Sequence, residues 1–82
     1  MVIICFEKKF EDIVRKVKDT VLKEKVKKQI QKIVENPEIG KPMRYARKGT
    51  REIYVSPFRL SYAYIQSESK IIFLDLYHKD NQ

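Results

Sequence analysis

Basic and aromatic side chains are interspersed in the second half of the chain, and their chemistry suits a nucleic acid. The basic residues are Lys41, Arg44, Arg47, Lys48, Arg51 and Arg59, and two of the tyrosines of this region, Tyr54 and Tyr77, are interleaved with them. Cations bind phosphate oxygens and aromatic faces stack on unpaired bases, so single-stranded RNA is a suitable ligand for this set. A solvated basic surface, in which Arg59 forms an ordinary ion pair with Asp75, accounts for the same residues without a ligand.

A second candidate for chemistry lies near the end of the chain. His78, the single histidine, stands beside Lys79 and Asp80. An imidazole near a basic surface can transfer a proton close to neutral pH, although many surface histidines have no such role. One cysteine and one histidine at unrelated positions give no metal-ligand spacing, and the sequence has neither a glycine-rich phosphate loop nor a serine elbow. We therefore expect no metal and no cofactor.

Two helices are predicted between residues 7 and 35. Apolar residues recur at helical spacing in two stripes: Phe10, Ile13, Val14 and Val17, then Leu22, Val26, Ile30 and Ile33. At ~100° per residue the second stripe is rotated by about 150° from the first, so one straight helix could not bury both against one surface. We expect a break at Asp19 and Thr20, where a side chain can cap a new N-terminus, and hence helices over about 7–18 and 20–35.

The strand pattern predicts how Arg59 is presented. The stretch SPFRLSYAY, residues 56–64, alternates apolar and polar residues as a half-buried strand does. Strands are expected over 51–56, 58–65 and 70–77, with Ile53, Val55, Leu60, Tyr62, Tyr64, Ile72, Leu74 and Leu76 on the helix-facing side. The opposite face then carries Glu52, Tyr54, Arg59, Ser61, Asp75 and Tyr77, with Ile71 and Phe73 nearby. Arg59 should therefore point into an open polar groove on the uncovered face of the sheet.

The predicted fold class is α+β, in one domain that spans residues 1–82. A short first strand over residues 2–6 leads into the helical hairpin, and an irregular connection after Asn36 and Pro37 leads to an antiparallel three-stranded meander. These elements form a single sheet with both helices on one face. A chain of 82 residues buries only about 60–65% of its unfolded surface, which leaves room for one two-layer core.

Composition narrows the compartment and the class of partner. The formal charge of +7 attracts polyanions such as RNA, DNA, anionic lipid or an acidic protein. The single cysteine, Cys5, cannot form an internal disulfide, which suits a reducing compartment. No segment approaches the ~18 apolar residues of a membrane span, and the first residues lack the charge pattern of a signal peptide. We expect a cytoplasmic protein that does not insert into membranes.

The segment GKPMRYARKGTREIYVSPFRLSYAYIQSESKIIFLDLYHKD, residues 40–80, resembles the RelE/ParE superfamily of toxins from toxin–antitoxin systems. Its most specific pieces are GKPMR and FRLSY, and the order of predicted elements matches that family over nearly the whole chain. The resemblance to the RelE branch implies a ribonuclease that enters the ribosomal A site. Such an enzyme cuts mRNA without a metal, by attack of a ribose 2′-OH on the adjacent phosphate.

The resemblance also implies roles for individual residues. Arg59 matches the arginine that stabilises the phosphate, and Lys79, with His78, falls near the second basic position after the last strand. Glu52 and Tyr54 stand where the best-known RelE enzymes carry two lysines. Glu52 then serves as the base, as a carboxylate does in some branches, and Tyr54 or Tyr77 stacks on a base. The family's C-terminal tyrosine has no counterpart in this sequence.

Two other functions are compatible with the same residues. ParE relatives with this fold inhibit DNA gyrase, and a non-catalytic module could use the basic groove to bind RNA or an acidic protein. The resemblance further implies a cognate RelB-like antitoxin, which we expect to be acidic and partly disordered when free. It should contact the surface around Arg44, Arg47 and Arg51 and the sheet edge.

Overall fold

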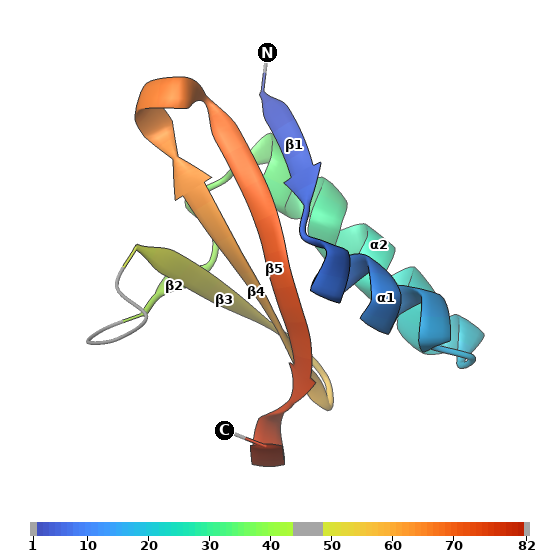
Figure 1. Cartoon of the computed structure of the whole chain (residues 1–82). Helices are drawn as coiled ribbons and strands as arrows, with labels where there is room; N and C mark the ends of the chain where they lie inside the picture. The colour runs from blue at the N-terminus through green and yellow to red at the C-terminus, as the bar shows by residue number, and fades with distance from the viewer. Residues whose placement is uncertain (1, 44–48, 82) are drawn as a thin grey trace.

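The computed structural model describes residues 2–43 and 49–81. Its elements, in chain order, are β1 (Ile3–Phe6), α1 (Lys8–Lys16), α2 (Thr20–Glu35), β2 (Lys41–Pro42), β3 (Thr50–Val55), β4 (Phe58–Ile65), a 3₁₀ turn (Gln66–Glu68), β5 (Lys70–His78) and a second 3₁₀ turn (Lys79–Asn81). A twisted sheet forms one layer and the two helices form the other (Figure 1). The predicted α+β class, with both helices on one face, is confirmed.

The helix break falls where the sequence predicts it. The Asp19 carboxylate accepts hydrogen bonds from the backbone N–H groups of Val21 and Leu22, which caps the N-terminus of α2. The residues of both predicted stripes belong to the core or pack against it. No helix among residues 2–43 and 49–81 is both long enough and apolar enough to span a membrane.

The sheet has one more strand than the sequence predicts. Its strand order is β1-β5-β4-β3-β2, with β1 parallel to β5 and the other neighbours antiparallel. Lys41 and Pro42, expected in an irregular connection, instead pair with Glu52 and Arg51 as a two-residue edge strand. This short pairing places Lys41 directly beside the polar row of β3.

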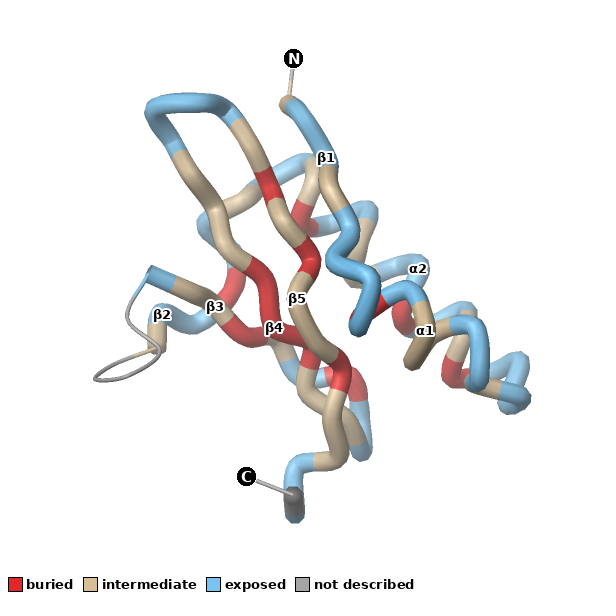
Figure 2. The backbone as a smooth tube through the Cα atoms, viewed as in Figure 1, coloured by how far each residue is buried: buried red, intermediate tan, exposed pale blue. Residues whose placement is uncertain are grey.

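An aromatic cluster around Phe73 lies in the core and reaches the surface at Phe6, which is 45% exposed. The Phe73 ring lies 5.2 Å from the Phe6 ring, 5.6 Å from the Phe10 ring and 6.1 Å from the Tyr62 ring, measured between centroids. These rings come from β5, β1, α1 and β4, so the cluster joins the first helix to the middle of the sheet. Figure 2 shows the buried positions on β3, β4 and β5 and along the helices.

A β-bulge in β5 corrects the predicted face of part of that strand. Ser61 pairs with Asp75 but Tyr62 pairs with Phe73, so Leu74 is an extra residue. One extra residue turns the preceding side chains to the other face. The core residues of this segment are therefore Ile71 and Phe73, both with 0% of their surface exposed, and the prediction of Ile72 and Leu74 was wrong. Leu76, beyond the bulge, is buried as predicted.

Candidate functional site

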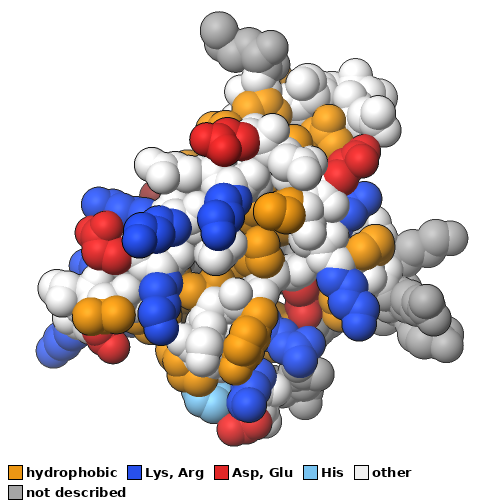
Figure 3. Space-filling model, turned by 180° about the vertical axis from the view of Figure 1, so that it is seen from behind, with side chains coloured by type: hydrophobic (Ala, Val, Ile, Leu, Met, Phe, Trp, Pro, Cys, Tyr) orange, Lys and Arg blue, Asp and Glu red, His pale blue; other side chains and the backbone are white. Residues whose placement is uncertain are grey.

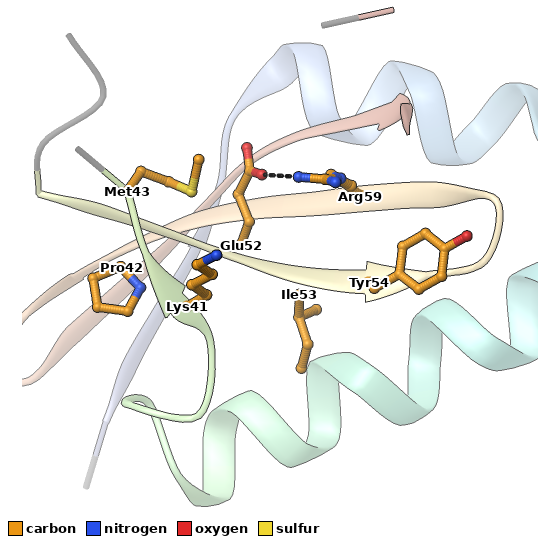
Figure 4. A pocket seen from close by; sticks show the side chains of 7 residues that line it. All are labelled: Lys41, Pro42, Met43, Glu52, Ile53, Tyr54 and Arg59. Carbon is orange, nitrogen blue, oxygen red and sulfur yellow. Dashed lines mark ion pairs between the residues drawn. The ribbon is translucent and has the colours of Figure 1, made fainter. Parts of the chain in front are cut away.

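A groove of about 800 Å³ lies on the sheet beside β2 and β3. Its lining residues are Lys41, Pro42, Met43, Glu52, Ile53, Tyr54 and Arg59. In Figure 4, Glu52 and Arg59 point to the same side of the sheet and toward each other, while Ile53 points the other way, toward α2. Alternation along β3 and β4 thus presents polar side chains on the face that the helices leave uncovered.

Three polar side chains from three adjacent strands meet on this face. The Arg59 Nη1 atom lies 3.6 Å from Glu52 Oε1, and the Tyr77 hydroxyl donates a hydrogen bond to Glu52 Oε2. Arg59 is the register partner of both Tyr54 on β3 and Tyr77 on β5. The Glu52 side chain is only 5% exposed, whereas that of Arg59 is 39% exposed. The carboxylate is therefore part of the floor of the site, and the guanidinium reaches its surface.

Asp75 forms its ion pair with Lys9, and not with Arg59 as the alternative interpretation of the sequence has it. Asp75 Oδ2 lies 3.1 Å from the Lys9 ammonium nitrogen, and Asp75 Oδ1 accepts a hydrogen bond from the backbone N–H of Leu76. Beyond Phe73, β5 has no β1 residue beside it in the described register, so this side chain covers an edge N–H group. Asp75 thus contacts α1 through Lys9 and accepts a backbone hydrogen bond at the edge of the sheet.

Arg51 lies on the other face from Arg59. It neighbours Glu52 in the strand and pairs in register with Tyr62, a core residue. Its Nη1 donates to the carbonyl oxygens of Glu38 and Gly40, at 3.0 and 2.9 Å. The structure thus gives Arg51 a contact that holds the segment before β2, on the opposite face of the sheet from Arg59.

Tyr62 anchors the same segment from within the core. Its hydroxyl accepts a hydrogen bond from the Gly40 N–H at 2.9 Å and donates one to the Pro37 carbonyl at 2.8 Å. A Cβ atom on Gly40 would lie 2.6 Å from the Tyr62 hydroxyl oxygen, so this close approach requires glycine. Burial raises the pKa of Tyr62, while the Gly40 hydrogen bond and the Arg51 charge act in the opposite direction.

His78 also lies away from the Arg59 cluster. It pairs in register with Phe58, which packs against the core, whereas Tyr77 pairs with Arg59 on the other face. The His78 ring meets the Phe58 ring edge-on at 5.5 Å. Its Nδ1 accepts a hydrogen bond from the Asp80 N–H and lies 3.6 Å from Asp80 Oδ2. The second contact is an ion pair only when both ring nitrogens are protonated, and Nδ1 then no longer accepts from the N–H.

The remaining predicted residues are distributed as follows. Lys41 lines the groove, and Tyr54, which is 52% exposed, presents a ring at its end. Lys79 is exposed and begins the last 3₁₀ turn. Arg44, Arg47 and Lys48 lie outside the described residues. Met43 in the groove and Tyr62 as an anchor were not predicted, because neither a thioether nor a core tyrosine signals a site in the sequence.

Positive charge is not confined to the groove. Figure 3, which views the molecule from behind, shows Lys and Arg side chains spread over that face with acidic and hydrophobic side chains between them. The net charge alone therefore does not mark a site, and the Arg59 cluster is distinguished by its geometry. Within the described parts of the chain, no three His, Cys, Asp or Glu side chains gather as a metal site.

Comparison with known proteins places the chain in a family. Residues 5–82 match the model of the ParE toxin of type II toxin–antitoxin systems. No curated protein sequence matches. Solved structures show the same fold at low sequence identity.

Three of these structures illustrate the likeness. A chain of the intact E. coli RelBE toxin–antitoxin complex is 21% identical, with a TM-score of 0.77 over 95% of this chain and 96% of that chain. A chain of the RelBE2 toxin–antitoxin complex from Mycobacterium tuberculosis is 20% identical, with a TM-score of 0.80 over 95% and 98% of the two chains. The YoeB/ParE toxin from Agrobacterium tumefaciens is 14% identical, with a TM-score of 0.83 over 94% and 98%. The chain belongs to the ParE toxin family of type II toxin–antitoxin systems.

Proposed function

We propose that this toxin is an endoribonuclease that cuts mRNA on the ribosome and so inhibits translation. The observation that carries the proposal is the placement of Arg59, a partly exposed cation at a groove on the uncovered face, beside a buried carboxylate. Phosphate gains negative charge when a ribose 2′-oxygen attacks it, and a fixed guanidinium stabilises that charge. Lys41 at the groove adds a second cation for the RNA backbone.

The reaction needs two proton transfers in addition to this charge. As the 2′-oxygen bonds to phosphorus and the bond to the 5′-oxygen breaks, a base accepts the 2′-OH proton and an acid protonates the leaving oxygen. The products are a 2′,3′-cyclic phosphate and a 5′-OH end. The roles predicted from the sequence, with Glu52 as base and Lys79 with His78 at the second basic position, remain predictions. The exposed ring of Tyr54 suits stacking on a base.

The test uses purified ribosomes programmed with a defined mRNA. Wild-type protein should produce cuts within the codon in the A site, mapped by primer extension. Arg59→Ala should lower the cleavage rate by about 10²- to 10³-fold, because a preorganised charge is lost. The matched control is Arg15→Ala, since Arg15 lies on α1, is 74% exposed and contacts Asp12 rather than the groove. Circular dichroism establishes that each variant is folded.

A gyrase inhibitor is the second candidate, favoured by the match of residues 5–82 to the ParE model. The same preparation should then inhibit DNA supercoiling by gyrase and leave mRNA intact. RNA binding with a steep salt dependence, but no cleavage on ribosomes and no effect on gyrase, would instead identify a binding module. These three results exclude one another for a single preparation.

The proposed partner is an acidic antitoxin encoded beside the toxin. The E. coli and M. tuberculosis structures are complexes of a toxin with its antitoxin. A chain with a formal charge of +7 suits an acidic partner, because opposite charge speeds encounter. Co-expression with the neighbouring small reading frame should restore growth and yield a stable complex in the cytoplasm. A toxin that is harmless alone, and binds no neighbouring gene product, would contradict this pairing.

A further inference from the structure

The Tyr77 hydroxyl and the Glu52 carboxylate form a connection across the uncovered face. β4 lies between β3 and β5, so the hydrogen bond from Tyr77 to Glu52 reaches over the strand that carries Arg59. The residues are 25 positions apart in the sequence. The same carboxylate pairs with Arg59 through its other oxygen. Three strands are thereby tied together at the point where the guanidinium emerges.

The burial of Glu52 indicates whether its carboxylate acts as a general base or as a fixed anchor. A general base must come within hydrogen-bond reach of the substrate proton. The Glu52 side chain is only 5% exposed, and its two oxygens face a cation and a hydroxyl donor. A buried carboxylate is tolerated when it is paired and hydrogen-bonded in this way. The geometry therefore suits a fixed anchor better than a group that meets the ribose.

We propose that Tyr77 and Glu52 are positioning residues for Arg59. The Tyr77 hydroxyl fixes the Glu52 carboxylate, and the carboxylate holds the guanidinium at the groove, where its 39% exposed side chain meets a phosphate. A guanidinium carries five N–H donors in a planar fork, so pairing with Glu52 is compatible with a phosphate contact. The inference rests on the proposed function. It replaces the base role of Glu52 and the stacking role of Tyr77.

Cleavage kinetics test the connection with two conservative variants. Tyr77→Phe removes one hydroxyl and should lower kcat by about 10- to 100-fold with little change in KM, because Arg59 is less well placed in the transition state. Glu52→Gln keeps an acceptor for Tyr77 and should retain measurable cleavage with the wild-type pH profile. Tyr64→Phe is the matched control, since Tyr64 packs on the helix-covered side and the substitution also removes one hydroxyl.

A second readout does not depend on cleavage. In ¹⁵N NMR spectra the Arg59 Nε–Hε signal of the wild type should be distinct from that of Arg15, which is 74% exposed. Tyr77→Phe should move the Arg59 signal toward the Arg15 position, and Tyr64→Phe should leave it unchanged. This measurement reports on the guanidinium itself, so it remains informative if the protein acts on another target.

The outcomes separate the inference from the proposed function. If the wild type cuts no mRNA but Tyr77→Phe moves the Arg59 signal, the nuclease proposal is wrong and the positioning network stands. If Tyr77→Phe cleaves at the wild-type rate and leaves the Arg59 signal unchanged, the network has no positioning role. A loss of cleavage in Glu52→Gln far larger than that in Tyr77→Phe, with loss of the acidic limb from the pH profile of the residual rate, would identify Glu52 as the base and overturn the inference.

Discussion

Each face of the sheet carries an arginine and a tyrosine, and the two pairs make different contacts. On the helix-covered face, Arg51 donates to main-chain carbonyls, and the fully buried Tyr62 holds Gly40 and Pro37. On the uncovered face, Arg59 pairs with a carboxylate at the groove, and Tyr77 donates to that carboxylate. An arginine turned onto neutral backbone acceptors stabilises a loop, whereas one held at an open groove can meet an anion.

The largest expected effect concerns the core that supports both faces. Phe73→Ala should lower the free energy of unfolding by about 3–5 kcal/mol, because it removes the ring at the centre of the aromatic cluster. Ile72→Ala, one residue earlier on the opposite face, should cost far less. Urea denaturation measures both. Equal losses for the two variants would contradict the bulge that turns Phe73 into the core.

The tyrosine anchor on the helix-covered face has the next largest effect. Gly40→Ala places a methyl group 2.6 Å from the Tyr62 hydroxyl oxygen and should cost about 1–3 kcal/mol through overpacking. Tyr62→Phe removes the partner of two backbone groups and should cost a similar amount. Thermal or urea unfolding checks both. A Gly40→Ala protein as stable as the wild type would show that the segment is not held as described.

The raised pKa of Tyr62 predicts that the stability of the fold depends on pH. Burial raises the Tyr62 pKa above its ordinary value of 10.0, so above pH 10 the unfolded chain loses this proton while the folded chain keeps it. The folded state then binds more protons, and its stability falls as pH rises, by at most about 1.4 kcal/mol per pH unit. The stabilisation is complete below pH 10. Between pH 9 and 11 the stability of Tyr62→Phe should fall less steeply than that of the wild type; identical slopes would refute the assignment.

The smallest expected effect is that of the edge ion pair. Lys9→Ala should change stability by less than about 1 kcal/mol, because the Lys9 side chain is 69% exposed and its pairing with Asp75 is screened by water. Adding 0.5 M salt to the wild type should cause a comparably small change. A loss as large as that of Gly40→Ala would mean that this edge matters as much as the anchor.

The sequence predicts well what depends on neighbouring residues. The cap at Asp19, the two helices, the three main strands and the position of Arg59 on the uncovered face follow from periodicity and local chemistry. The alternation also carried a signal for Arg51, since a residue next to Glu52 must face the other way. Charge alone does not separate Arg51 from Arg59, whereas the alternation of the strand does.

Three features could not be predicted, because they depend on distant contacts or leave no pattern in the sequence. The run IIFLDL is apolar at both parities, so no pattern reveals that Leu74 is an extra residue. The burial of Glu52 depends on Tyr77, which reaches it from a strand formed 25 residues later. The two-residue β2 contains a proline and is too short to leave a period-two pattern.

The most direct test of the division between the two faces changes each arginine to lysine, which keeps the net charge constant. Arg59→Lys should lower mRNA cleavage on programmed ribosomes by about 10- to 100-fold, because an ammonium lacks the planar fork, while changing the free energy of unfolding by less than about 1 kcal/mol. Arg51→Lys should lose about 1–3 kcal/mol of stability through its two carbonyl contacts. The folded Arg51→Lys protein should cleave at close to the wild-type rate. Equal effects of the two variants on cleavage, or the reverse pattern, would contradict the assignment of Arg59 to the site and Arg51 to the fold.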